Sequence, residues 1–146
     1  MNELEFSIDI KATREKVWDV LWRDDTFRGW ASIIDPGTYM VGDLQQGNEV
    51  QFISAENGYG VTSLVQAIIP NEHLVLLHQV DTQSTGKQER DKEWTGGKEE
   101  YILTENNSVT TLKTVFDVPR DLEAYFKAAY PKALQLIKEM AETSTT

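Results

Sequence analysis

The sequence predicts an α+β fold, in which a curved antiparallel sheet of about seven strands wraps around a long C-terminal helix. Three observations support this prediction. Apolar and polar residues alternate near the start of the chain and again from Thr38 to Val118, which is the period of a half-buried strand. Two short segments with helical spacing lie between these regions. From Arg120 onward, apolar residues recur on one helical stripe.

The first strand is predicted at Glu3–Lys11, and a short helix follows it. Thr13 has a side chain suited to cap this helix, and Glu15 lies in its first turn, where the helix dipole favours a carboxylate. We expect Asp24-Asp25-Thr26 to break the helix and Phe27–Trp30 to form a second short helical turn.

Six more strands follow, with alternating residues in each and turn residues between them. They are predicted at Thr38–Val41, Glu49–Ser54, Gly60–Ile69, Leu74–Val80, Lys98–Thr104 and Val109–Val118. Asn57-Gly58 supplies the positive-φ residues of a tight turn, and Pro70-Asn71 and Asn106-Asn107 play similar parts. Short turns between successive strands indicate an antiparallel sheet. The polar stretch Asp81–Gly97 is predicted to be a longer loop around Trp94.

The C-terminal segment has the pattern of an amphipathic helix. Pro131 removes one helical hydrogen bond, so we expect a kink or a restart near Tyr130. Residues 1–142 are predicted to form a single domain, and residues 143–146 a disordered tail. A sheet curved around a helix leaves a space between the two, which is a natural place for a ligand.

Composition excludes several classes of function. The 146 residues suit one domain, and their net charge of −10 repels phosphate backbones and anionic lipid heads. We therefore expect neither nucleic-acid binding nor docking to membranes. The chain contains no cysteine, no signal-peptide pattern and no apolar run long enough to span a bilayer, so a cytoplasmic location is expected. No cofactor or metal motif occurs, and we expect no cofactor.

The inner face of the last strand is half threonine. Thr110 and Thr114 alternate there with Leu112 and Phe116. A dry core would favour Val or Leu at these positions, because a buried hydroxyl needs a partner. The threonines either face a cavity or bond to neighbouring strands, and Gln66 would add a polar group if it points inward with Leu64.

The ionisable residues leave alternatives open. His78 shares the inner face of its strand, either as a satisfied core histidine or as a polar anchor or acid/base. The carboxylates near Trp94 are interpreted as a solvated charge run; if the Tyr101 face is the inner one, Glu99 points inward and Glu100 is solvated. Trp94 itself is either pinned by packing or part of a gate. No nucleophile–histidine–acid pattern is visible in the sequence.

Four segments resemble the START-like, Bet v 1-like (SRPBCC) superfamily, and in particular its branch named after the activator of Hsp90 ATPase. They are IKATREKVWDVLWRDDTFRGWA, GNEVQFISAENGYGVTSLVQAIIPNEHLVLLH, WTGGKEEYILTENNSVTTLKT and YPKALQLIKEMAE. The resemblance covers about Glu5 to Glu142. It implies a helix-grip fold with a cavity under the C-terminal helix, in a superfamily that includes lipid carriers, cyclases and hydrolases.

The resemblance and the residue pattern together predict the lining of that cavity. Trp18 is assigned to the core, whereas Trp22 and Trp30 lie where this fold opens its cavity. The candidate lining residues are Trp22, Trp30, Phe52, Leu64, Gln66, His78, Tyr101, Thr110, Thr114, Phe116, Phe126 and Tyr130.

Three hypotheses of function follow. The first is a protein that binds a small apolar or aromatic molecule. The second is a cyclase- or hydrolase-like enzyme that uses His78 and a tyrosine as acid and base. The third is a stress protein that interacts with an Hsp90-type chaperone. A homodimer is also reasonable, because the sheet has exposed edges.

Overall fold

The computed structural model describes residues 1–56, 58–83 and 94–143. Its helices are α1 (Arg14–Trp22), α2 (Asp24–Ile34), the 3-10 turn η1 (Arg120–Leu122) and α3 (Glu123–Thr143). Its strands are β1 (Asn2–Ile10), β2 (Thr38–Val41), β3 (Glu49–Ser54), β4 (Tyr59–Ile69), β5 (His73–Gln83), β6 (Lys98–Asn106) and β7 (Val109–Val118). The predicted order of elements is confirmed.

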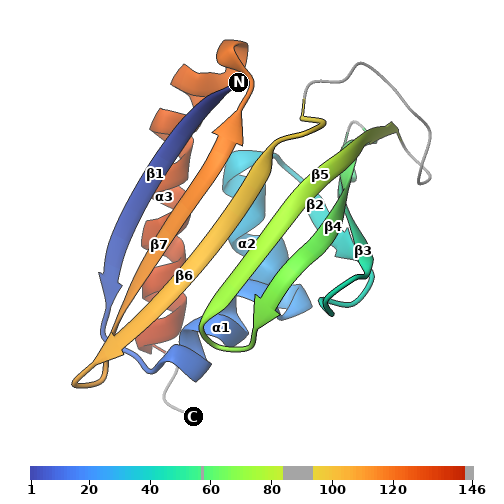
Figure 1. Cartoon of the computed structure of the whole chain (residues 1–146). Coiled ribbons are helices and arrows are strands. Elements are labelled where there is room, and N and C mark those ends of the chain that lie inside the picture. Colours follow the sequence, from blue (N-terminus) through green and yellow to red (C-terminus); the bar gives the residue numbers. More distant parts are fainter. Residues whose placement is uncertain (57, 84–93, 144–146) are drawn as a thin grey trace.

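The seven strands form one antiparallel sheet in the order β1-β7-β6-β5-β4-β3-β2. Strands β2 to β7 follow one another as a meander, and β1 joins the outer edge of β7. All three α-helices lie on one face of this curved sheet, with α3 running along β1 and β7 (Figure 1). This is the expected helix-grip arrangement. None of the described helices combines the length and the apolar composition that crossing a bilayer requires.

The start of the helical region follows the sequence signals in part. The Thr13 side chain accepts a hydrogen bond from the backbone N–H of Lys16 and caps α1, as expected. The prediction that Asp24-Asp25-Thr26 breaks the helix is wrong in position. The break lies at Arg23, and Asp24 and Asp25 instead form the first turn of α2, where the helix dipole stabilises carboxylates. The second helix is therefore 11 residues long rather than one short turn.

The C-terminal helix corrects two parts of the prediction, the alternative of a restart near Tyr130 and the residue at which the tail begins. The helix α3 continues through Pro131 without a second start. Pro131 and Lys127, whose carbonyl loses its helical partner, are both exposed, so that carbonyl can bond to water. Thr143 belongs to the helix rather than to the tail, and residues 144–146 lie outside the described part of the chain.

Two irregularities in β4 overturn part of the predicted inner face. Val65 pairs with Leu76 and Ala67 with Val75, so Gln66 is the extra residue of a bulge and is exposed. Leu64 is half-buried on the outer face of the sheet. A second shift, between Thr62 and Ser63, leaves both of these side chains fully buried. The prediction that Leu64 and Gln66 point inward is therefore wrong, because a bulge moves the following residues to the opposite face.

The alternation in β7 holds without interruption. Thr110, Leu112, Thr114, Phe116 and Val118 are buried, and the residues between them are half-buried. On β5, Leu74, Leu76 and His78 are buried in the same way. These inner faces meet α2 and α3 in one core, and this places Tyr130 of α3 against Phe116, with ring centroids 4.7 Å apart.

Candidate ligand-binding pocket

A pocket of about 170 Å³ opens between α2, α3 and the inner face of the sheet. Nine of its eighteen lining residues are Phe, Trp or Tyr. The lining residues are Phe27, Trp30, Ala31, Ile34, Asp35, Thr38, Phe52, Ser54, Tyr59, Gly60, Val61, His78, Trp94, Glu99, Tyr101, Phe116, Phe126 and Tyr130. Half of the wall is therefore aromatic, and the polar groups in it are few.

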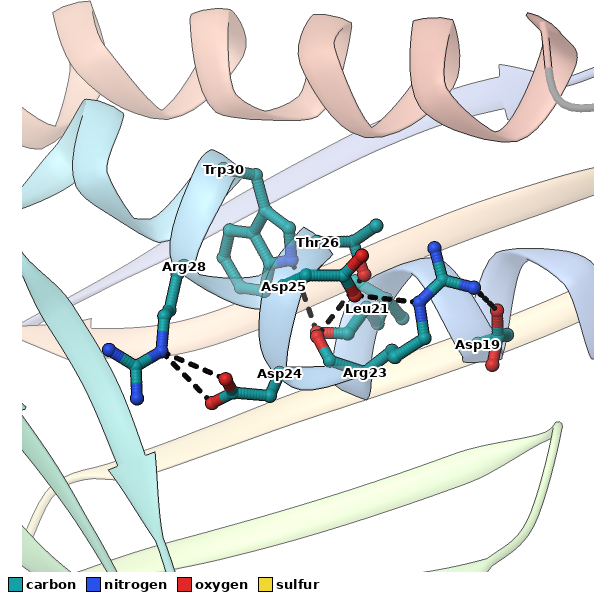
Figure 2. Close-up of polar contacts among 8 residues, drawn as sticks. All are labelled: Asp19, Leu21, Arg23, Asp24, Asp25, Thr26, Arg28 and Trp30. Carbon is teal, nitrogen blue, oxygen red and sulfur yellow. Dashed lines mark hydrogen bonds and ion pairs between the residues drawn. The ribbon is translucent and has the colours of Figure 1, made fainter.

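The helix α2 holds the Trp30 side of the pocket in place. The indole Nε1 of Trp30 donates a hydrogen bond to the carbonyl of Leu21, 3.1 Å away (Figure 2). Phe27 packs edge-on against Trp30, with ring centroids 5.1 Å apart. On the solvent side, Arg23 pairs with Asp19 of α1 at 2.8 Å and with Asp25 of α2 at 2.7 Å, which ties the two helices together at their junction (Figure 2).

Trp94, which precedes β6, forms part of the pocket wall. Its backbone N–H lies 3.0 and 3.1 Å from the two carboxylate oxygens of buried Asp81. Its ring lies 5.4 Å from the ring of Phe126 and 6.1 Å from that of His78, between centroids. Thr95 also donates to Asp81, at 2.8 Å. Of the two alternatives for Trp94, the structure shows tertiary packing that pins it.

One end of the pocket is polar and centres on Glu99. Its Oε1 lies 3.5 Å from Nε2 of His78, and its Oε2 accepts a hydrogen bond from the hydroxyl of Tyr101. The other ring nitrogen of His78, Nδ1, lies 2.7 Å from the hydroxyl of Ser63. The Glu99 side chain is 25% exposed, whereas that of His78 is 3% exposed. The interpretation of Glu99 as part of a solvated charge run is wrong, because the Tyr101 face of β6 is the inner one.

The electrostatics of this end keep Glu99 charged and the phenols neutral. Burial by itself raises the pKa of Glu99, but His78 and the Tyr101 hydroxyl outweigh burial and hold the pKa below its ordinary value. Burial, together with the neighbouring carboxylate, raises the pKa of Tyr101 well above its ordinary value. Burial also raises the pKa of Tyr130. A carboxylate and two phenol groups therefore face one another at neutral pH.

Two hydroxyl groups at this end lack a well-formed hydrogen bond. The hydroxyl of Tyr130 lies near the hydroxyls of Tyr101 and Thr114. Within the described part of the chain, neither Tyr130 nor Thr114 has a hydrogen-bond partner of good geometry, although both are buried. An unsatisfied buried hydroxyl costs about 1–3 kcal/mol. The polar end of the pocket therefore has unused hydrogen-bonding capacity.

Seven of the twelve predicted lining residues lie on the pocket wall. They are Trp30, Phe52, His78, Tyr101, Phe116, Phe126 and Tyr130. Two more lie just behind it: Trp22 packs edge-on against Tyr101 at 4.9 Å between centroids, and Thr114 is beside Tyr130. Thr110 lies elsewhere and donates to the carbonyl of Ala12 at 2.7 Å, which is the alternative of bonding to neighbouring backbone. Leu64 and Gln66 face away from the pocket.

Several lining residues were missed by the sequence analysis. Glu99 shares its parity with Tyr101, but the run of charged residues around it masks this signal in the sequence. Phe27 belongs to the same helical face as Trp30, and the longer α2 makes that clear. Asp35 and Tyr59 lie at the exposed side of the pocket, and no local sequence signal distinguishes them from other turn residues.

The Ser63–His78–Glu99 chain is not arranged as a hydrolase triad. In a triad, the serine hydroxyl meets the substrate, and the acid orients the far side of the histidine ring. Here Ser63 is fully buried and is not on the pocket wall, whereas Glu99 is. Ser63 therefore orients His78, and Glu99 is the group that a ligand can reach. Among residues 1–56, 58–83 and 94–143, no three histidine or carboxylate side chains gather in a way that could hold a metal ion.

The fold is shared with solved structures of low sequence similarity. Protein MLL2253 from Mesorhizobium loti superposes with a TM-score of 0.76 at 14% identity, covering 99% of this chain and all of that one. The Aha1 dimer from Colwellia psychrerythraea gives 0.74 at 19% identity, with both chains fully covered. DynU16, from the dynemicin biosynthetic locus, gives 0.70 at 14% identity over 98% of this chain and 48% of its own.

Comparison by sequence adds no closer relative. No protein-family profile matches the chain, and no protein of curated function matches it. The likeness to solved structures extends over nearly the whole chain, from β1 to α3, and agrees with the segments that resemble the superfamily. The chain therefore shares the helix-grip fold of these solved structures.

Proposed function

We propose that this protein binds a small, largely aromatic or apolar molecule in the pocket under α3. The observation that carries the proposal is the pocket wall itself, in which nine aromatic side chains surround one polar end. Ligand sites in proteins have this composition: a mostly apolar cleft with a few polar groups that fix the orientation of the ligand.

The size of the pocket supports a ligand with one aromatic ring. Its volume of about 170 Å³ is close to that of an apolar cavity of about 150 Å³ that accepts benzene. Rigid rings in the wall provide contact area with little loss of side-chain entropy. Because the pocket is open on the side of Asp35 and Tyr59, a ligand tail can extend toward solvent.

Native mass spectrometry of the freshly purified chain, before and after solvent extraction, tests the proposal. We expect an added mass that extraction removes. Ala31→Leu places a larger side chain in the pocket wall and should reduce this added mass, whereas Ala124→Leu, on the exposed face of α3, should not. A bare polypeptide mass, together with no binding of small aromatic probes, would contradict the proposal.

An enzyme is the second candidate, and one observation favours it. The ring of His78 lines the pocket and lies 3.5 Å from Glu99, so a histidine–carboxylate pair capable of proton transfer borders the space that a ligand would fill. A cyclase- or hydrolase-like reaction would require His78. Loss of turnover in His78→Gln, with ligand binding retained, would support it; turnover that persists in this variant would count against it.

Two partner predictions also remain proposals. The likeness to the Aha1 dimer from Colwellia psychrerythraea supports testing for a second copy of the chain and for an Hsp90-type chaperone. Light scattering coupled to size-exclusion chromatography measures the first, and a monomer mass would reject the dimer. The ATPase rate of a purified chaperone with and without the protein measures the second, and an unchanged rate would reject it. The cytoplasmic location is likewise a prediction.

A further inference from the structure

Among the residues that the structure describes, the pocket wall has two carboxylates, and His78 is its one side chain that can become cationic. The carboxylates are Glu99 at the inner polar end and Asp35 at the exposed side, and the described part of the wall includes no lysine or arginine. The whole chain carries a net charge of −10. A charged ligand that enters this pocket therefore meets negative potential, which attracts cations and repels anions.

The carboxylate of Glu99 can accept a hydrogen bond from a ligand that approaches it more closely than His78 does. The separation of 3.5 Å between Glu99 Oε1 and His78 Nε2 exceeds the usual 2.7–3.2 Å of an N–H···O hydrogen bond. Among the described residues, the Tyr101 hydroxyl is the one group that donates to this carboxylate at close range. A charged N–H donor in the pocket could approach Oε1 more closely than His78 does and would form a charge-assisted hydrogen bond.

The groups around Glu99 complete a site for such a donor. The Tyr130 hydroxyl has no hydrogen-bond partner of good geometry and can accept from an N–H group. The rings of Trp94 and Phe126 lie 5.4 Å apart between centroids and border the same space. The faces of aromatic rings attract cations, and this attraction is stronger where water is excluded. A carboxylate, a hydroxyl and aromatic rings in one pocket wall together match an ammonium group attached to an apolar body.

On the basis of the proposed ligand-binding function, we infer that the pocket selects an organic cation, namely an aromatic or alkyl amine in its ammonium form, with the nitrogen at Glu99 and the apolar body against the wall of α2. Neutral hydroxylated aromatics could also donate to Glu99, but they gain nothing from the negative potential. Aromatic carboxylates would place a second negative charge beside Glu99. These two classes are the competing outcomes of the test.

Three probes of similar shape separate the classes: benzylammonium, benzyl alcohol and benzoate. Each is titrated near pH 7 into the full chain, and binding is followed by tryptophan fluorescence, because Trp30 and Trp94 both line the pocket. Fragments of this size bind with constants on the order of millimolar, so the titrations extend to saturation. We expect benzylammonium to bind at least about tenfold more tightly than benzyl alcohol, and benzoate most weakly.

A matched pair of variants locates the effect. Glu99→Gln removes the inner charge, whereas Glu100→Gln removes the charge of the next residue, which lies on the opposite face of β6 beside His73. We expect Glu99→Gln to abolish the preference for benzylammonium over benzyl alcohol and Glu100→Gln to retain it. Should Glu99→Gln fail to fold, salt dependence in the natural chain replaces it: added salt should weaken the binding of benzylammonium but not of benzyl alcohol.

The outcomes distinguish this inference from the proposed function. Equal or tighter binding of benzyl alcohol or benzoate, or an unchanged preference in Glu99→Gln, would overturn the assignment of an organic cation while leaving a ligand pocket. Failure of all three probes to bind at saturating concentrations would overturn both.

Discussion

For two tyrosines in the same pocket, we predict that replacement by phenylalanine changes the stability of the fold in different directions. Tyr101 and Tyr130 are 2% and 4% exposed, and their rings both line the pocket. The Tyr101 hydroxyl donates to the carboxylate of Glu99, whereas the Tyr130 hydroxyl has no hydrogen bond of good geometry. Replacement of each by phenylalanine removes one hydroxyl and leaves the ring. The effect on stability therefore depends on whether the lost hydroxyl had a hydrogen-bond partner.

The expected magnitudes follow from those partners. Loss of a hydrogen bond to a charged group costs about 1.5–3 kcal/mol, and we take the lower end, about 1.5, because Glu99 is a quarter exposed and water can replace the lost donor. Removal of an unsatisfied buried hydroxyl costs nothing and can stabilise the fold by about 1 kcal/mol. At this chain length, 1 kcal/mol shifts Tm by roughly 2–4 °C. Tyr101→Phe should lower Tm by about 3–6 °C, whereas Tyr130→Phe should leave it unchanged or raise it by up to about 4 °C.

Thermal and urea unfolding, followed by circular dichroism, measure both variants under identical conditions. Equal losses of stability would show that the Tyr130 hydroxyl is hydrogen-bonded after all, and the argument from unused hydrogen-bonding capacity would fail. A second readout concerns the ligand. If Tyr130 accepts from an ammonium group, Tyr130→Phe should weaken the binding of benzylammonium even though the fold is as stable as before or more so.

Three further predictions concern the fold. Burial raises the pKa of Tyr101 and of Tyr130 above the ordinary 10.0, so the unfolded chain loses these protons before the folded chain does. The free energy of unfolding should therefore fall as pH rises above 10, by up to about 1.4 kcal/mol per pH unit for each tyrosine. Urea unfolding at successive pH values should show half of the combined slope in either phenylalanine variant. Thr13→Ala removes the cap of α1 and should cost about 1 kcal/mol, and no loss of Tm would contradict the capping role. Gly60→Ala should lower the free energy of unfolding by about 2–3 kcal/mol, because the added Cβ would lie 2.0 Å from the carbonyl oxygen of Phe52. A variant as stable as the natural chain would show that β3 and β4 can move apart to make room for it.

Much of the sheet could be predicted from the period of apolar residues. Strands β2, β3 and β7 have the predicted bounds, and in β7 buried residues alternate with half-buried ones along the whole strand. The prediction failed where the backbone is irregular. The bulge at Gln66 shifts the parity of β4, and no residue type in that strand predicts the bulge. Leu64 and Gln66 were therefore assigned to the wrong face.

The order of elements, the face that β7 buries and the aromatic character of the core can be predicted from the sequence, because they depend on local periodicity and on residue type. Which polar groups meet depends on contacts between distant segments of the chain. Ser63, His78 and Glu99 lie on three successive strands, and each of them, considered alone, can be explained as an ordinary structural residue. Strand register brings them together, and register is set by bulges and by long-range packing rather than by any short segment. Because the polar end of the pocket depends on strand register, it exists only in the folded chain and cannot be predicted from any one segment.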